Sequence, residues 1–74
     1  MTKLPVVSGR DAVRVFEKLG YAFDRQRGSH MILRQATPPH RRLTIPDHKE
    51  LGKGTLRTLI REAGLNVEEF TKLL

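Results

Sequence analysis

Apolar side chains recur with helical spacing near the start of the chain. Four of them stand at relative positions 0, 3, 4 and 7 and therefore share one face of a helix. They are Ala12, Val15, Phe16 and Leu19. Ser8 and Asp11 have the spacing of a capping box, and Gly20 supplies the left-handed residue with which many helices end. The pattern predicts a first helix over residues 9–19.

The middle of the chain alternates between apolar and polar residues, as strands do. Residues 21–26 and residues 29–34 form two such runs, and Gly28 between them marks a hairpin. A third run, residues 41–45, is ended by Pro46. We therefore expect three antiparallel strands.

The last third of the chain returns to helical spacing. A second helix is predicted from about Thr55 to Ala63, with Gly64 closing it. Asn66 and Glu69 have the spacing of another capping box, which opens a third helix. The apolar face of that helix is expected to hold Val67, Phe70 and Leu74.

The predicted order is helix, three strands and two helices, within a single domain that spans residues 1–74. A chain of 74 residues has room for one small domain. Because the helices are amphipathic, they most simply cover one face of the sheet and leave the other open. The fold class is therefore α+β, with two layers and the order α-β-β-β-α-α.

The side chains on the open face depend on the hairpin between the first two strands. A two-residue turn at Arg27 and Gly28 would place His30 on the core face beside Phe23. A three-residue loop over residues 27–29 would place His30 on the open face and Met31 in the core. We favour the three-residue loop, because it separates apolar from polar residues better. The open face would then hold His30, Asp24, Gln26 and Arg34.

Charge is unevenly distributed along the chain. The net charge is +6, and residues 1–44 hold nine Lys or Arg against three Asp or Glu, whereas residues 45–74 hold five of each. A localised basic surface is typical of proteins that bind polyanions, above all nucleic acids, although it can also serve solubility alone. No cysteine is present, which excludes disulfides and thiolate metal sites. With no apolar run near the ~20 residues of a membrane span and no secretion signal, we expect a cytoplasmic location.

Basic residues also form two rows at intervals of four along the predicted helices. The first row is Arg10, Arg14 and Lys18, and the second is Lys53, Arg57 and Arg61. Like charges at this spacing cost a helix roughly 0.2–0.5 kcal/mol per pair. The rows therefore favour a compensating anion, with relief by Glu17 and screening by solvent as alternatives.

His30 is the histidine with the most suggestive surroundings. It follows the glycine turn, where a polyanion would dock among nearby arginines, and an imidazole can exchange protons near neutral pH. Those arginines are Arg25, Arg27 and Arg34. His40 is interpreted as a surface residue, and His48 either contacts phosphate or hydrogen-bonds locally. The histidines lack metal-ligand spacing, so we expect no metal and no cofactor.

Several short motifs follow one another in a fixed order. They are Ser8-Gly9, Tyr21-Ala22-Phe23, Arg27-Gly28-Ser29-His30, Thr44-Ile45-Pro46-Asp47-His48, Lys53-Gly54-Thr55-Leu56 and Ile60-Arg61-Glu62-Ala63-Gly64. Together they resemble the HicA toxins, the mRNA interferases of HicA–HicB type II toxin–antitoxin systems. Each motif alone is weakly specific, whereas their order and spacing are specific, and the resemblance covers nearly the whole chain.

The resemblance implies a fold similar to a double-stranded RNA-binding domain and ribosome-independent cleavage of RNA, with His30 as the catalytic residue. It also implies a HicB-type antitoxin that binds the toxin and masks this histidine, and any DNA contact would be made by the antitoxin. The chain departs from many members at Met31, where they carry a second histidine.

The chemistry expected of such a site needs no metal. Neutral His30 would take the proton of a ribose 2′-hydroxyl, which attacks the adjacent phosphorus and expels the 5′-oxygen. The RNA-binding residues that we predict are Arg25, Arg27, Gly28, Ser29, Arg34, Arg42 and Lys53. The alternative is a non-catalytic RNA-binding module that uses the same basic surface.

Overall fold

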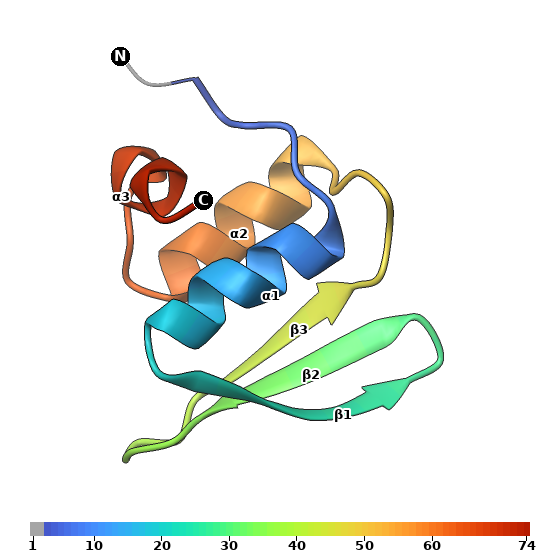
Figure 1. Ribbon diagram of the computed structural model, residues 1–74, viewed down its shortest axis with the longest axis vertical. Coiled ribbons are helices and arrows are strands. Elements are labelled where there is room, and N and C mark those ends of the chain that lie inside the picture. The colour runs from blue at the N-terminus through green and yellow to red at the C-terminus, as the bar shows by residue number, and fades with distance from the viewer. Residues whose placement is uncertain (1–2) are drawn as a thin grey trace.

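The structure of the chain, a computed structural model, describes residues 3–74 (Figure 1). Its elements are α1 (Gly9–Lys18), β1 (Tyr21–Arg27), β2 (His30–Gln35), β3 (Arg42–Pro46), α2 (Lys53–Glu62) and α3 (Val67–Lys72). The predicted α+β class and element order are confirmed.

Two of the three helices, α1 and α3, begin where the sequence predicts caps, whereas α2 begins at Lys53, two residues before the predicted Thr55, without a side-chain cap. The Ser8 hydroxyl accepts a hydrogen bond from the Asp11 backbone N–H, and the Asp11 carboxylate accepts one from the Ser8 backbone N–H. Asn66 and Glu69 form the same reciprocal pair in front of α3. Gly20, just after α1, has a φ of 97°, which glycine adopts without strain. Local sequence signals thus set these three helix boundaries.

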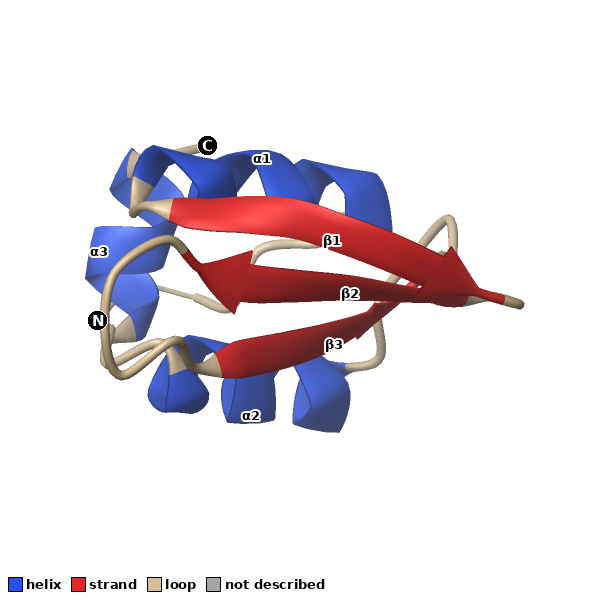
Figure 2. Ribbon diagram, turned by 90° about the horizontal axis from the view of Figure 1, so that it is seen from below, coloured by secondary structure: helices blue, strands red, loops and turns tan. Residues whose placement is uncertain are grey.

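The strands form one antiparallel sheet in the order β1-β2-β3. Figure 2 shows the strands in front and the helices behind them, so that within residues 3–74 only one face of the sheet is covered by helices. The core between the layers is a single apolar cluster. Its most deeply buried side chains are Phe16, Phe70, Leu33, Leu43, Ile45, Leu56 and Val15. The two predicted layers are therefore present.

One of the three residues predicted for the apolar face of α3 is wrong. Phe70 is fully buried and Val67 packs against the core as expected. Leu74, however, is 51% exposed, and Leu73 packs against the core instead. The reason is that α3 ends at Lys72, so Leu74 no longer follows helical spacing. Among the described helices, none has the length and apolar character needed to cross a membrane.

The hairpin differs from both alternatives considered for it. Arg27 pairs with His30, so the turn consists of two residues, Gly28 and Ser29, and the expected three-residue loop is wrong. Gly28 has a φ of 59°, as the first position of such a turn often requires. Met31 is nevertheless buried and His30 exposed, as the favoured register predicted.

A bulge in β1 explains this outcome. The register shifts between Phe23 and Arg25, which leaves Asp24 as an extra residue. Without the bulge Phe23 would lie opposite Arg34, whereas with it Phe23 lies opposite buried Leu33. The bulge also moves Gln26, which pairs with Met31 and faces the helices. The expectation that Gln26 shares the open face with His30 is therefore wrong.

Candidate active site

The open face of the sheet carries His30 together with four arginines. In β2, His30, Ile32 and Arg34 alternate with the buried Met31 and Leu33 and so point away from the helices. Residues directly opposite one another across antiparallel strands point to the same face. The partners of the three open-face residues of β2 are Arg27, Arg25 and Ala22 in β1 and Pro46, Thr44 and Arg42 in β3. We call these nine residues the open face.

His30 stands at one end of this face, beside the hairpin turn. Its imidazole belongs to an exposed residue, and its two cross-strand neighbours are Arg27 and Pro46. Cβ atoms of such directly opposed residues are about 5 Å apart. A base and a guanidinium are therefore within reach of one phosphodiester group.

Arg34 and Arg42 lie at the other end of the face. Arg34 is four positions after His30 in β2, which is about 13 Å along a strand. Arg34 and Arg42 are directly opposite each other, an arrangement that is unfavourable for like charges. Within residues 3–74 no ion pair joins either of them to an acid, and Arg34 Nε is buried without a hydrogen-bond partner. This end of the face thus has unsatisfied positive charge and an unsatisfied donor.

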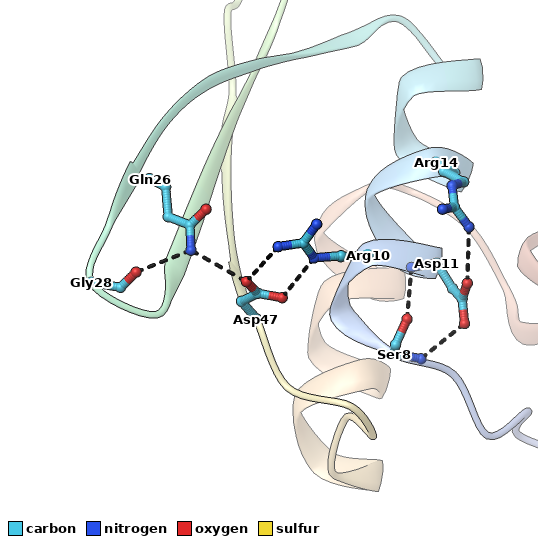
Figure 3. A network of polar contacts seen from close by, with 7 residues as sticks. All are labelled: Ser8, Arg10, Asp11, Arg14, Gln26, Gly28 and Asp47. Carbon is cyan, nitrogen blue, oxygen red and sulfur yellow. Dashed lines mark hydrogen bonds and ion pairs between the residues drawn. The ribbon is translucent and has the colours of Figure 1, made fainter.

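Asp47 holds the turn that precedes His30 from the side of the sheet that faces the helices (Figure 3). The Asp47 backbone N–H donates to the Ser29 carbonyl at 2.6 Å. The Gln26 side-chain amide donates both to the Gly28 carbonyl, at 3.1 Å, and to Asp47 Oδ2, at 3.3 Å. The loop after β3 is therefore tied to both residues of the turn.

Arg10 links Asp47 to α1. Its Nε and Nη2 atoms donate to the two carboxylate oxygens of Asp47, each at 3.2 Å, in a forked arrangement. The Arg10 hydrogen bond, followed by weaker help from its charge and from Gln26, lowers the pKa of Asp47 below its ordinary value despite partial desolvation. The same contact raises the pKa of Arg10. Asp47 is therefore charged in the folded protein at neutral pH.

Gly9 lets the start of α1 approach this loop closely. A Cβ atom at Gly9 would collide with the Pro46 carbonyl oxygen, and the Gly9 N–H donates to the His48 carbonyl at 2.9 Å. Only glycine fits against this backbone without displacement of the helix or the loop. The loop over residues 46–48 is thereby seated on α1.

The basic row along α1 has polar partners inside the molecule. Arg10 pairs with Asp47, Arg14 Nη1 lies 3.3 Å from Asp11 Oδ1, and Lys18 Nζ donates to the Leu73 carbonyl at 2.7 Å. Two carboxylates and a backbone carbonyl therefore stabilise this row, whereas Glu17, the alternative partner, forms no ion pair with it among residues 3–74. In the second row, Lys53, Arg57 and Arg61 are exposed along α2.

The structure brings together most of the residues predicted to bind RNA. Gly28 and Ser29 form the turn, and the predicted arginines share the open face with His30. Those arginines are Arg25, Arg27, Arg34 and Arg42. Lys53 is not brought there, because it begins α2 in the layer on the other side of the sheet.

Sequence reasoning missed the residues behind the turn. Arg10 was noted only as part of a charge row, Gln26 was placed on the wrong face, and Asp47 was given no role. The three come together across separations of up to 37 residues, which no local pattern reveals. The motif Thr44–His48, which contains Asp47, was the one sequence feature that pointed to this part of the chain.

The other histidines are not among the nine residues of the open face. His40 has a φ of 56° in the loop between β2 and β3, and its Nδ1 is 3.1 Å from the Gln35 carbonyl. His48 is exposed, and its backbone carbonyl is the atom that contacts α1. Among residues 3–74 no three His, Cys, Asp or Glu side chains gather in a way that could hold a metal ion.

Comparison with known families adds one match. The family model described as the HicA toxin of bacterial toxin–antitoxin systems matches residues 9–65. The matched range begins with α1, includes the whole sheet and α2, and ends just before α3. No curated protein matches the chain.

Proposed function

The chain belongs to the HicA toxin family of bacterial toxin–antitoxin systems, and we propose that it is an endoribonuclease that cleaves mRNA with His30 as the catalytic residue. Cleavage of transcripts inhibits translation and growth. A HicB-type antitoxin is the protein partner that covers His30, and DNA is contacted only through that antitoxin. Because its substrate is mRNA, the protein acts in the cytoplasm.

The observation that carries this proposal is the position of His30. An exposed imidazole stands at the end of an uncovered sheet face, directly opposite Arg27 and on the same face as three further arginines. A base beside a set of guanidinium groups is what cleavage of a phosphodiester at a neighbouring hydroxyl requires.

In the proposed reaction the nucleophile is supplied by the RNA. Neutral His30 takes the proton of a ribose 2′-hydroxyl, and the 2′-oxygen forms a bond to the adjacent phosphorus. The bond from phosphorus to the 5′-oxygen breaks, and that oxygen takes a proton from solvent. The products are a 2′,3′-cyclic phosphate and a 5′-hydroxyl end. The attacking group is part of the substrate, so the scheme needs no metal ion.

The arginines of the open face divide into two groups in this scheme. Arg27, opposite His30, stabilises the additional negative charge that develops on the reacting phosphate, and Arg25 next to it supports binding. Arg34 and Arg42 are too far along the sheet for that phosphate and hold one further along the RNA chain. Gly28 and Ser29 shape the turn beside the reacting group, whereas Lys53, at the start of α2 in the helix layer, has no part in this scheme.

The test is cleavage of a defined RNA by the purified chain and by two histidine variants. We expect His30→Ala to keep the fold and to lose about 10²- to 10⁴-fold in rate, the usual contribution of general acid–base catalysis. The matched control is His40→Asn, which removes an exposed imidazole far from the turn at a backbone conformation that asparagine tolerates. This control should cleave like the parent, and growth arrest in cells should follow the same order.

Three outcomes contradict the proposal or part of it. If His30→Ala cuts RNA as fast as the parent, His30 is not the catalytic residue. If the parent binds RNA but leaves it intact after long incubation, the chain is a non-catalytic RNA-binding module instead. Loss of cleavage in the presence of a chelator would contradict the metal-independent scheme.

A further inference from the structure

The catalytic geometry proposed for His30 depends on a turn that lies at the rim of the molecule. Gly28 and Ser29 are both exposed, and glycine adds conformational freedom to the turn. A displacement of about 1 Å at a reacting group can cost on the order of 10²-fold in rate. Something must therefore fix the backbone immediately before His30.

Three hydrogen bonds provide this fixation from the side that faces the helices. The Ser29 carbonyl is held by the Asp47 backbone, the Gly28 carbonyl by the Gln26 side chain, and the same Gln26 amide by Asp47 Oδ2. Figure 3 shows Asp47 between Gln26 and Arg10, with Gly28 beyond Gln26. The turn is thus connected through Asp47 to another element of the fold.

That element is α1, and it is itself well anchored. The forked Arg10 contact takes up both carboxylate oxygens of Asp47. Gly9, which precedes Arg10, and His48, which follows Asp47, are joined by a backbone hydrogen bond. Since α1 contributes Ala12, Val15 and Phe16 to the core, the chain of contacts ends in the hydrophobic core of the molecule.

The Asp47 carboxylate does not itself reach the proposed reaction centre. Its neighbour Pro46 lies on the open face opposite His30, whereas the carboxylate contacts Arg10 and Gln26 on the opposite side. Its effect on His30 must therefore pass through the turn. We propose that Asp47 is a positioning residue, which clamps the Gly28-Ser29 turn to α1 and so fixes His30 for RNA cleavage. The inference rests on the proposed ribonuclease function.

The kinetic test compares two aspartates that both pair with an arginine of α1. Asp47→Ala should lower kcat on a defined RNA about 10- to 100-fold and leave KM unchanged, because the RNA is held by the open-face arginines. The control, Asp11→Ala, removes the partner of Arg14 and the carboxylate half of the capping box of α1, so it should lower the melting temperature and leave kcat unchanged. Rates are measured well below the melting temperature of each variant.

A second readout does not depend on catalysis. Amide order parameters from NMR relaxation report backbone motion on the picosecond to nanosecond scale. In Asp47→Ala we expect them to fall at Gly28, Ser29 and His30, while the values in α1 and α2 stay at those of the parent. Asp11→Ala should leave the turn as rigid as in the parent.

A second variant tests the inference if Asp47→Ala does not fold. Gln26→Ala, at an exposed position, breaks the contacts to Gly28 and Asp47 but leaves the Arg10 fork intact. Because two of the three hydrogen bonds that hold the turn involve the Gln26 amide, it should give a fall in kcat of similar size and the same local loss of order.

The outcomes separate this inference from the proposed function. If the parent cleaves RNA and Asp47→Ala, or Gln26→Ala in its place, cleaves equally fast, the clamp is overturned while the function stands. If the parent does not cleave RNA, the proposed function fails and the order parameters decide the clamp. A turn that stays rigid in the variant then overturns it.

Discussion

Two basic surfaces of this small protein use the same residue types in different ways. Along α1, Arg10, Arg14 and Lys18 each have a partner within the molecule, namely Asp47, Asp11 and the Leu73 carbonyl. On the open face of the sheet, no acid within residues 3–74 forms an ion pair with any of the four arginines. The number of positive charges is therefore less informative than their pairing. Exposed Lys53, Arg57 and Arg61 along α2 also form no ion pair among residues 3–74, so it is the unpaired charge beside His30 that supports a site for an external anion.

The difference has a physical basis in the energetics of each surface. The α1 contacts are exposed, and exposed ion pairs contribute little on average, so their value lies in holding neighbouring segments in place. The open face instead keeps Arg34 and Arg42 opposite each other at a cost, with one buried donor unsatisfied. A bound phosphate group would remove both penalties.

The largest expected effect comes from exchanging one arginine on each surface. Arg27→Gln should slow cleavage at saturating RNA about 10²- to 10³-fold, as removal of a donor that stabilises transition-state charge usually does. Arg14→Gln should leave the rate unchanged, because Arg14 pairs with Asp11 on α1, away from the open face. Single-turnover rates of the two variants measure the contrast, and equal rates would mean that Arg27 does not stabilise the reacting phosphate.

The next effect concerns stability at the seat of α1. Gly9→Ala places a methyl group against the Pro46 carbonyl and should lower the free energy of unfolding by about 1–3 kcal/mol. Gly54→Ala is the control, since nothing lies within 4 Å of a Cβ there and alanine favours the helix. Urea denaturation of both variants tests this. An unchanged midpoint for Gly9→Ala would show that α1 is not seated on this loop.

A smaller effect distinguishes the two ends of the open face. Arg42→Gln should lower kcat/KM about tenfold on a long RNA, because it removes one charged hydrogen bond to a phosphate. It should have no effect on a dinucleoside monophosphate, whose single phosphate is the one cleaved at His30. Arg27→Gln should slow both substrates. If Arg42→Gln slows the short substrate equally, Arg42 acts on the reacting phosphate itself.

The smallest effect is the acid sensitivity of the α1 contacts. Folding lowers the pKa of Asp11, chiefly through the Ser8 backbone hydrogen bond, and that of Asp47, chiefly through Arg10. Depressed carboxyl pKa values contribute stability that is present above the unfolded value and is lost as the pH falls through the folded value. The melting temperature should therefore decline below about pH 4, and less steeply in Asp11→Ala and Asp47→Ala. Arg27→Gln should keep the slope of the parent.

Much of the fold was predictable because its signals are local. The capping boxes at Ser8 and Asn66, the glycine after α1 and the helical spacing of apolar residues each act within a few positions. The open face was predictable in part, since alternation along β2 assigns His30 and Arg34 to one side and Met31 to the other.

The remaining features depend on contacts between distant segments. The bulge at Asp24 has no sequence signal of its own, and it is what places Phe23 opposite Leu33 and not opposite Arg34. The bulge in turn decides that Gln26 faces Asp47. The clamp behind the turn therefore could not be inferred before the register was known.

One measurement tests most directly whether RNA binds the open face and not the α1 surface. An NMR titration of the chain with a 2′-O-methyl RNA, which cannot supply the attacking hydroxyl, reports the bound surface without cleavage. We predict chemical-shift changes at Arg25, Arg27, His30, Arg34 and Arg42 and none along Arg10, Arg14 and Lys18. Changes confined to the α1 row, with the open face unaffected, would contradict the account.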